Sequence, residues 1–110
     1  MTFVNLNNIK EFEISPGIRA RVVNSDSMSV AHVILDAGAI LPEHSHINEQ
    51  VVNVIEGELE LTVAGEARVL KPGVVEMLPP NEPHGGRALT NCRVIDVFQP
   101  IREDWLAMMT

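Results

Sequence analysis

The sequence predicts an all-β domain folded as a jelly-roll-like barrel, and three observations support this prediction. Short runs of β-branched or alternating apolar residues recur along most of the chain. Clusters of Gly, Pro, Asn, Asp and Ser separate these runs, and hardly any stretch has helical periodicity. The length of 110 residues suits one hydrophobic core and is too short for two. We therefore expect a single domain over residues 1–110, with the barrel core at about 28–99.

The first half of the chain begins with weak signals and then becomes regular. Residues 3–6 form at most an edge strand, whereas residues 18–22 alternate apolar residues with two arginines. This period predicts a half-buried strand whose arginines face solvent. Residues 28–35 are a further extended run, in which His32 alternates with two β-branched residues. The alternation predicts that His32 faces inward, as a hydrogen-bonded core histidine or at the border of a cavity.

The second half contains the more continuous strands. Residues 51–55 are almost uninterrupted β-branched residues, which is typical of a strand covered on both faces. A second sheet or a partner subunit must therefore cover the outer face of this strand. Residues 58–63 alternate cleanly and form a hairpin with 67–70. The remaining expected elements are strands at 74–78 and 92–99 and a short helix at 101–108.

The composition excludes several classes of protein. Hydrophobic residues make up 45% of the chain, which excludes general disorder. No apolar stretch approaches the roughly 18 residues that a membrane helix requires. The net charge of −7, without a Lys/Arg cluster, argues against nucleic-acid binding, and a small anionic substrate would need a local cation in its pocket. The single cysteine, Cys92, and a start without signal-peptide character predict a cytoplasmic protein.

Three of the four histidines lie where their side chains can converge on a metal ion. His44 and His46 are two residues apart in a β-like stretch, so both side chains leave the same face. Gln50 follows as the next strand begins, and His84 comes after a stiff, proline-rich turn. We expect these four residues to bind one divalent ion, and the sequence does not distinguish Zn, Ni, Mn, Fe and Cu. Glu49 is the alternative to Gln50 if the strand begins one residue earlier.

The predicted ligands are all neutral if Gln50 is the fourth donor. A divalent ion would then keep its full charge and act as a stronger Lewis acid than an ion with a carboxylate ligand. Non-haem iron oxygenases typically use two histidines and one carboxylate. The set of donors therefore favours proton transfer over oxygen chemistry.

The last strand carries a second group of polar and aromatic residues. Asp96 and Phe98 share a face of this strand, and Arg102 follows shortly after it. Beside a metal ion, Asp96 could move a proton, Phe98 could stack on a sugar ring, and Arg102 could bind a carboxylate through its two-pronged guanidinium. These roles suit an acidic sugar. The alternative is structural, with Asp96 paired to a surface arginine and Phe98 in the core.

These motifs resemble those of the cupin superfamily. Its first motif, with glutamine in place of the usual glutamate, is matched by Gly38, His44, His46, Gln50 and Gly57. Its second motif is matched by Pro72, Gly73, Pro79 and His84. The resemblance implies a cupin-type jelly-roll β-barrel with a short C-terminal helix or extension. It also implies a homodimer, because cupin-like barrels commonly pair through their sheets.

The C-terminal segment resembles that of a smaller group within the superfamily. Residues 96–105 and 79–85 look like those of the small single-domain cupins associated with pectin and alginate breakdown, which convert 4,5-unsaturated uronates into linear keto-deoxyuronates. In those proteins a glutamine replaces the glutamate ligand, and an Asp-x-Phe-x3-Arg pattern is functional. The residues of this chain that match are Gln50, Asp96, Phe98 and Arg102.

The resemblance implies a metal-dependent small cupin that linearises a cyclic unsaturated uronate by Lewis-acid-assisted proton transfer. Its catalytic residues would be Asp96, Phe98 and Arg102, and its partner an acidic sugar. Two other classes stay open, a metal-dependent dioxygenase and a non-catalytic sugar-binding or sensor cupin. Ile47 and Asn48 stand where the family often has Pro and His, which leaves the substrate open.

Overall fold

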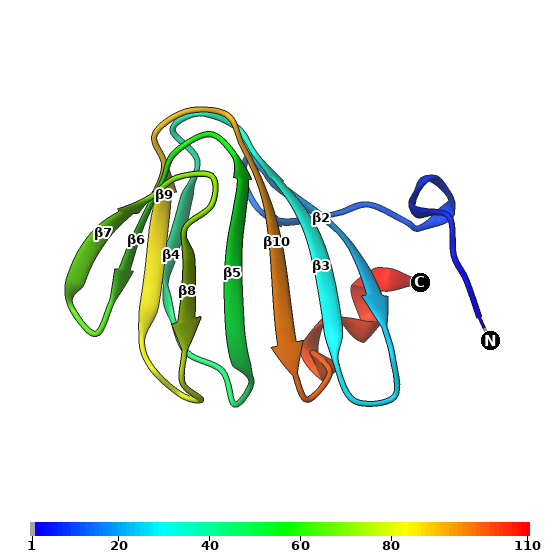
Figure 1. Cartoon of the computed structure of the whole chain (residues 1–110). Coiled ribbons are helices and arrows are strands. Elements are labelled where there is room, and N and C mark those ends of the chain that lie inside the picture. The colour runs from blue at the N-terminus through cyan, green and yellow to red at the C-terminus, as the bar shows by residue number, and fades with distance from the viewer. Residues whose placement is uncertain (1) are drawn as a thin grey trace.

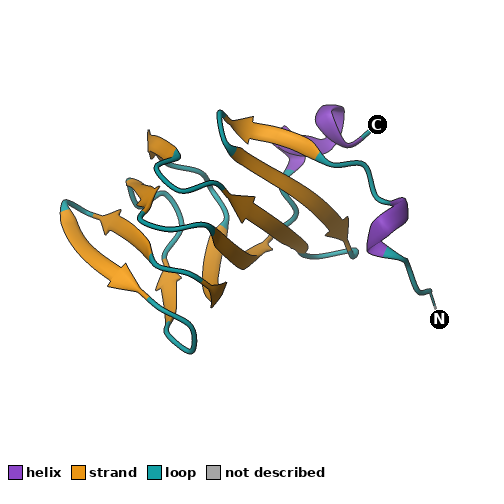
Figure 2. Cartoon of the chain, turned by 90° about the horizontal axis from the view of Figure 1, so that it is seen from above, coloured by secondary structure: helices purple, strands orange, loops and turns teal. Residues whose placement is uncertain are grey.

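The computed structural model of the chain describes residues 2–110, and in that range ten strands form two sheets. The six-stranded sheet has the order β1-β2-β3-β10-β5-β8, and the four-stranded sheet has the order β4-β9-β6-β7. The view from above separates the two sheets and places both termini on the same side of the molecule (Figures 1 and 2). The prediction of an all-β fold with a short C-terminal helix is confirmed.

The strands are short and follow one another with tight connections. The six-stranded sheet contains β1 (Phe12–Ser15), β2 (Ile18–Asn24), β3 (Ser29–Leu35), β5 (Glu49–Glu56), β8 (Val75–Leu78) and β10 (Cys92–Gln99). The four-stranded sheet contains β4 (Ile40–His44), β6 (Leu59–Val63), β7 (Glu66–Leu70) and β9 (His84–Ala88). Two 3-10 helices, η1 (Leu6–Asn8) and η2 (Glu103–Met109), lie outside the sheets.

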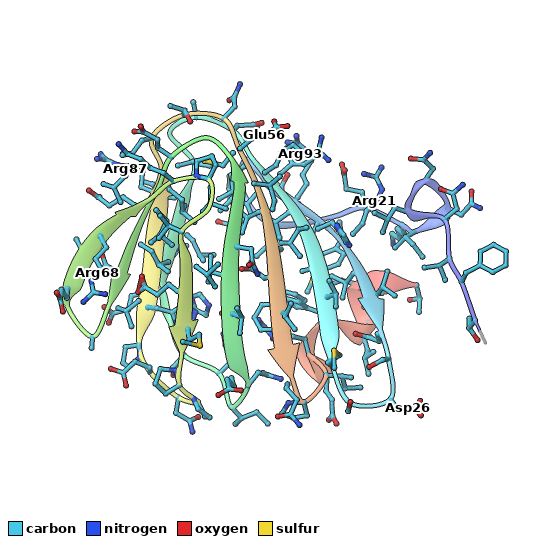
Figure 3. The ribbon with its side chains drawn as sticks, viewed as in Figure 1. Arg21, Asp26, Glu56, Arg68, Arg87 and Arg93 are labelled. Atoms are coloured by element: carbon cyan, nitrogen blue, oxygen red, sulfur yellow. The ribbon has the colours of Figure 1, made fainter. Side chains whose placement is uncertain are left out.

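The core lies between the two sheets, because alternate residues of each strand point inward. In β2, Ile18, Ala20 and Val22 are buried, while Arg19 and Arg21 lie on the outer face, as the alternation predicts. Most charged side chains, including those labelled in Figure 3, likewise lie at the periphery of the molecule. The interior thus contains apolar residues and the few polar residues of the site.

The turn after β5 explains one glycine of the predicted motif. Gly57 has a φ of +86°, a conformation that side chains with a Cβ rarely adopt. A Cβ at this position would also clash with the carbonyl oxygen of Asn91. Glycine therefore allows the turn between β5 and β6 to pack closely against the loop that precedes β10.

Three details differ from the sequence-based expectations. His32 is on the outer face of β3, because Ala31 and Val33 take the inner positions, so the prediction that it faces inward is wrong. Residues 3–6 form no strand in the described chain, since Phe3 is exposed and η1 begins at the end of this range. The C-terminal helix has 3-10 geometry, and only Trp105 of it is fully buried.

The outer face of β5 is left uncovered within one chain. Ile55 on β5 is 48% exposed, and Val75 and Met77 on β8, which pair with Asn53 and Val51 of β5, are 53% and 75% exposed, respectively. The expectation that a second sheet of the same chain covers this face is therefore wrong. A partner subunit remains the alternative.

Candidate metal centre

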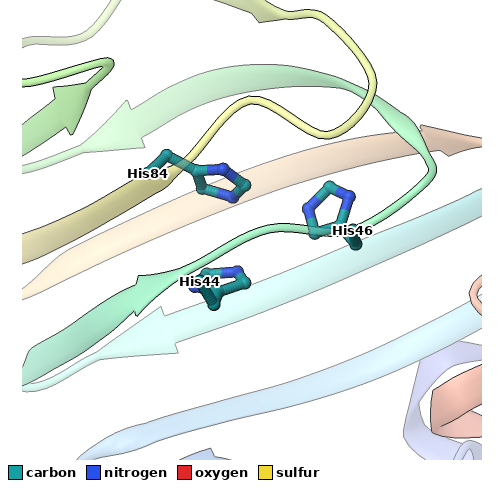
Figure 4. Close-up of side chains that lie close together, drawn as sticks. All are labelled: His44, His46 and His84. Atoms are coloured by element: carbon teal, nitrogen blue, oxygen red, sulfur yellow. The ribbon is translucent and has the colours of Figure 1, made fainter.

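The three predicted histidines meet at one end of the barrel. His44 ends β4, His46 lies in the loop after it, and His84 begins β9, where it is paired with His44 across the ladder (Figure 4). Their ring centroids are 4.3 to 5.6 Å apart. One ring nitrogen from each lies within 4.8 Å of the others, so the cluster could hold a metal ion. The structure thus brings together three residues that are up to 40 positions apart in the sequence.

Each imidazole is oriented by a nearby backbone carbonyl. The three Nδ1 atoms donate to the carbonyl oxygens of Pro42 (from His44, 2.9 Å), Asn48 (from His46, 3.0 Å) and Glu82 (from His84, 2.8 Å). Because a carbonyl oxygen can only accept, Nδ1 carries the proton in each ring. The Nε2 atoms are then unprotonated and available to a metal, which is the arrangement that metal-binding histidines use.

The surroundings of His46 and His84 favour the neutral imidazole. Burial, reinforced by the Arg102 cation and by His84, lowers the pKa of His46 to about 4. Burial also lowers the pKa of His84. Since only neutral imidazole binds a metal, these shifts reduce competition from protons near neutral pH.

Gln50, and not Glu49, lies beside the histidines. Gln50 is 7% exposed, and its Oε1 lies 3.1 Å from Nε2 of His46, whereas Glu49 is exposed. Both atoms of this contact are acceptors when Nδ1 of His46 carries the proton, and two acceptors repel unless a cation lies between them. The residues present therefore fit a metal ion.

A cavity of about 350 Å³ extends from the histidines into the barrel. Most of its wall is apolar, with contributions from both sheets. Its polar lining residues are Ser15, His44, Gln50, His84, Asp96 and Arg102. The three residues predicted from the last strand and the segment after it, Asp96, Phe98 and Arg102, thus share one cavity with His44, His84 and Gln50.

Asp96 places a carboxyl in this cavity. Its Oδ1 is buried and has no hydrogen-bond partner among the described residues. Burial raises the pKa of Asp96 to about 7, although the Gln50 amide and the Arg102 guanidinium act in the opposite direction. A carboxyl with this pKa can both accept and release a proton near neutral pH. The alternative that Asp96 pairs with a surface arginine is wrong, because no ion pair to it occurs within residues 2–110.

Arg102 is buried and held from several sides. Its Nε and Nη2 donate to the two carboxylate oxygens of Asp104 at 2.9 and 2.8 Å. Its guanidinium carbon lies 4.7 Å from the ring centre of Phe98 and 3.8 Å from that of Trp105. In the described structure no protein group accepts from Nη1, so one edge of the guanidinium can receive a second carboxylate.

The sequence reasoning missed two residues that shape this site. Asp104 takes one edge of Arg102, and that interaction lowers the pKa of the Asp104 carboxyl. The only signal in the sequence is that Asp104 lies two residues after Arg102. Asn48 is buried between the loop of His46 and the C-terminal segment. Phe98 was correctly placed on the face of Asp96, and one of its ring faces is covered by Arg102.

A two-sheet barrel with a histidine cluster inside it defines a class of proteins. Residues 31–98 match the family model described as a cupin domain, and the chain belongs to the cupin family. Within it, the chain is 37% identical over 97 residues to the pectin degradation protein KdgF of Dickeya dadantii (strain 3937). That match covers 86% of this chain and 88% of the relative.

Two solved structures are similar over nearly the whole chain. KdgF from a Halomonas species has a TM-score of 0.88 at 30% identity, and the match covers 96% of this chain and 99% of that one. A cupin described as RmlC-like, from Shewanella frigidimarina, has a TM-score of 0.88 at 29% identity, with 96% of each chain covered. The similarity therefore includes the C-terminal segment that carries Arg102. Neither of the 3-10 helices in residues 2–110 has the length and apolar character that a membrane-spanning helix needs.

Proposed function

We propose that this protein is a metal-dependent enzyme that converts cyclic 4,5-unsaturated uronates into linear keto-deoxyuronates. The observation that carries the proposal is the Asp96 carboxyl inside the cavity, whose buried Oδ1 has no hydrogen-bond partner among the described residues and whose pKa of about 7 suits a proton shuttle. It lines the same cavity as two of the clustered histidines and as Arg102. The similarity to pectin degradation protein KdgF supports an acidic sugar as the substrate.

The reaction needs one proton to move and no oxidant. The Asp96 carboxylate takes the proton of the anomeric hydroxyl. The C1–O double bond then forms while the bond between C1 and the ring oxygen breaks, and the ring oxygen and C5 become an enolate. Asp96 returns the proton to C4, which leaves an aldehyde at C1 and a ketone at C5. Substrate and product contain the same atoms, so the step is an isomerisation.

The other residues of the cavity bind and orient the substrate. The free edge of Arg102 receives the uronate carboxylate, while Asp104 holds the opposite edge. The ring of Phe98 packs against the guanidinium of Arg102 and supports it. Phe98 therefore contributes to sugar binding partly by positioning Arg102. The apolar walls exclude water, which strengthens the contacts of these charged groups.

The metal ligands in this proposal are His44, His46, His84 and Gln50. One divalent ion bound to them would supply Lewis acidity, which lowers the pKa of a hydroxyl that it contacts. Zinc, nickel, manganese, iron and copper all accept three imidazoles and an amide oxygen. The neutral donor set favours this proton-transfer chemistry over the oxygen chemistry of sites with a carboxylate ligand.

We also propose that the protein is a cytoplasmic homodimer. The exposed apolar residues Ile55, Val75 and Met77 on the outer face of β5 and β8 support pairing of this sheet with a second copy. A reducing compartment agrees with the single, buried and unpaired Cys92. Substitution of Met77 by Glu should give a monomer in analytical ultracentrifugation, and an unchanged mass would contradict the dimer interface.

The enzymatic proposal is tested by identifying the product and the need for oxygen. With a 4,5-unsaturated uronate monomer, proton NMR should show the vinyl signal of C4 replaced by a methylene, faster than in a protein-free blank and without oxygen uptake. Asp96→Asn should lower kcat by about 10²- to 10⁴-fold while the metal stays bound. The exposed Asp26 provides the control Asp26→Asn, which should keep the wild-type rate.

Each alternative predicts a different result. Oxygen consumption coupled to product formation would indicate a dioxygenase. Binding of the sugar without acceleration over the blank would indicate a sensor or sugar-binding protein. A wild-type rate in Asp96→Asn with metal bound would exclude Asp96 as the proton shuttle.

A further inference from the structure

Asn48 is a buried polar residue whose side chain touches neither the histidine cluster nor the cavity. It is 3% exposed, lies between His46 and Gln50 in the sequence, and neither lines the cavity nor belongs to the ligand set. Buried amides are retained where their hydrogen bonds are satisfied. The partners of Asn48 therefore indicate what this residue does.

The hydrogen bonds of Asn48 connect two parts of the site. Its backbone oxygen accepts from Nδ1 of His46 at 3.0 Å. Its side-chain amide donates to the carbonyl oxygens of Pro100 at 2.7 Å and Ile101 at 3.1 Å. These two carbonyls immediately precede Arg102. One residue thus links the metal-binding loop to the segment that carries the guanidinium.

The segment after β10, residues 100–109, is called here the C-terminal arm. The backbone N–H of Arg102 donates to Oγ of Ser29 at 2.8 Å, and Trp105 packs edge-on against Phe12 and Phe98. These contacts fix the middle of the arm. At its beginning, Asn48 alone among the described residues donates side-chain hydrogen bonds to Pro100 and Ile101.

We propose that Asn48 is a positioning residue that locks the C-terminal arm, and with it Arg102, against the metal-binding loop. Its two amide donors hold the start of the arm, so the free edge of Arg102 stays at a fixed place relative to the histidines. The consequence for catalysis rests on the proposed function, because it assumes that Arg102 receives the substrate carboxylate. The structural consequence, a locked arm, does not depend on that function.

Trp105 allows the arm to be observed without any substrate. It is the only tryptophan of the chain, is 6% exposed, and lies 3.8 Å from the guanidinium carbon of Arg102. Its fluorescence and its quenching by acrylamide therefore report whether the arm is docked. Loss of both amide donors in Asn48→Ala should raise the quenching constant about twofold or more, because the arm opens more often.

The kinetic readout separates positioning from general damage to the fold. With the unsaturated uronate, Asn48→Ala should raise KM about 10-fold and leave kcat within about threefold, as expected when binding of the carboxylate is weakened uniformly. The dissociation constant of the metal, measured by calorimetry with Zn²⁺ or Ni²⁺, should change less than about threefold, since the backbone oxygen of Asn48 is retained.

Two further variants complete the test. In Asn48→His, the ring atom Nδ1 is bonded to Cγ, as the amide nitrogen of asparagine is, and it can carry an N–H donor. This variant should therefore have a quenching constant and a KM within about twofold of the wild-type values. Asn53→Ala is the matched control, because the Asn53 amide also donates to a backbone carbonyl, that of Ile95 at 3.2 Å, but far from the arm in the sequence. This control should leave quenching, KM and metal affinity unchanged.

The outcomes distinguish the two proposals. If Asn48→Ala gives the same quenching as Asn53→Ala, the arm is not locked by Asn48 and the inference is overturned. If Asn48→Ala weakens metal binding as much as it raises KM, Asn48 acts on the histidine loop, which also overturns it. If the wild type turns over no uronate but Asn48→Ala still exposes Trp105, the proposed function fails and the lock stands.

Discussion

The site has a metal side, formed by His44, His46 and His84, and an arginine side, formed by Arg102. The side chains of the two sides are held by different kinds of contact. On the metal side, each histidine is oriented by a carbonyl only two residues away in the sequence. On the arginine side, the backbone of Arg102 is held by Ser29, 73 residues away, and the start of the arm by Asn48, 52 and 53 residues away from its partners. The rings of the metal side are thus set by local geometry, and the position of Arg102 by the whole fold.

This difference predicts how the two sides respond to perturbation. Local hydrogen bonds survive small movements of the sheets, so the histidines should keep their orientation when the arm is disturbed. The arm depends on contacts that all have to form together, so it should loosen before the metal side does. Substitutions on one side should therefore leave the readouts of the other side unchanged.

The largest effect is expected on the metal side. His84→Ala removes a proposed metal ligand that is 2% exposed and should lower kcat/KM by about 10³-fold, because Lewis-acid stabilisation is worth several kcal/mol. Calorimetry should show weaker metal binding, while Trp105 fluorescence should stay as in the wild type. His32→Ala, on the outer face of β3, is the matched control and should change neither property. A red-shifted Trp105 in His84→Ala would contradict the independence of the two sides.

An intermediate effect is expected at the guanidinium. Arg102→Lys keeps the charge but cannot hold Asp104 and a substrate carboxylate with two parallel pairs of hydrogen bonds. We expect KM to rise about 10- to 100-fold, with kcat and metal affinity nearly unchanged. Arg93→Lys, at an exposed position on β10, serves as the control (Figure 3). An unchanged KM in Arg102→Lys would show that the arm does not bind the substrate carboxylate.

A third effect is one on stability, and it concerns Asp96 in the metal-free protein. Its pKa is raised from 3.8 to about 7 by burial, so between these values the native state keeps a proton that the unfolded chain releases. The stabilising contribution of Asp96 is therefore lost as the pH rises through this range. His46, whose pKa is lowered to about 4, gives the opposite slope below about 6.5.

Comparison with a variant isolates the contribution of Asp96. Asp96→Asn should gain free energy of unfolding relative to the wild type as the pH rises from about 4 to about 8, by roughly 2 to 4 kcal/mol. Urea unfolding of the chelated proteins at several pH values provides the measurement. Parallel pH profiles of the two proteins would mean that Asp96 has an ordinary pKa.

The same contrast explains how much could be predicted from the sequence. The strand at residues 92–99 was predicted to its ends, and the spacing of His44, His46 and Gln50 correctly predicted that these residues lie together. Both predictions rest on alternation or spacing within one segment. His32 was misplaced because β3 has apolar residues on both faces, so its pattern has no clear phase.

The residues that the sequence could not reveal act over long distances along the chain. Asn48 meets Pro100 and Ile101 only because β5 and β10 are neighbours in the sheet. The burial of Arg102 depends in the same way on Phe98 and Trp105, which pack across its faces. Nothing in the local sequence of either segment specifies its partner. The topology of the sheets determines which segments are partners, so these contacts could be identified only from the fold.

The most direct test of the account is the decay of ultraviolet absorbance of a 4,5-unsaturated uronate monomer. Metal-loaded protein is compared with chelated protein, with His44→Ala and with a protein-free blank, because such sugars open slowly unaided. We predict a metal-dependent acceleration that is lost on chelation and in His44→Ala. Decay at the rate of the blank with every common divalent ion would contradict the proposed function.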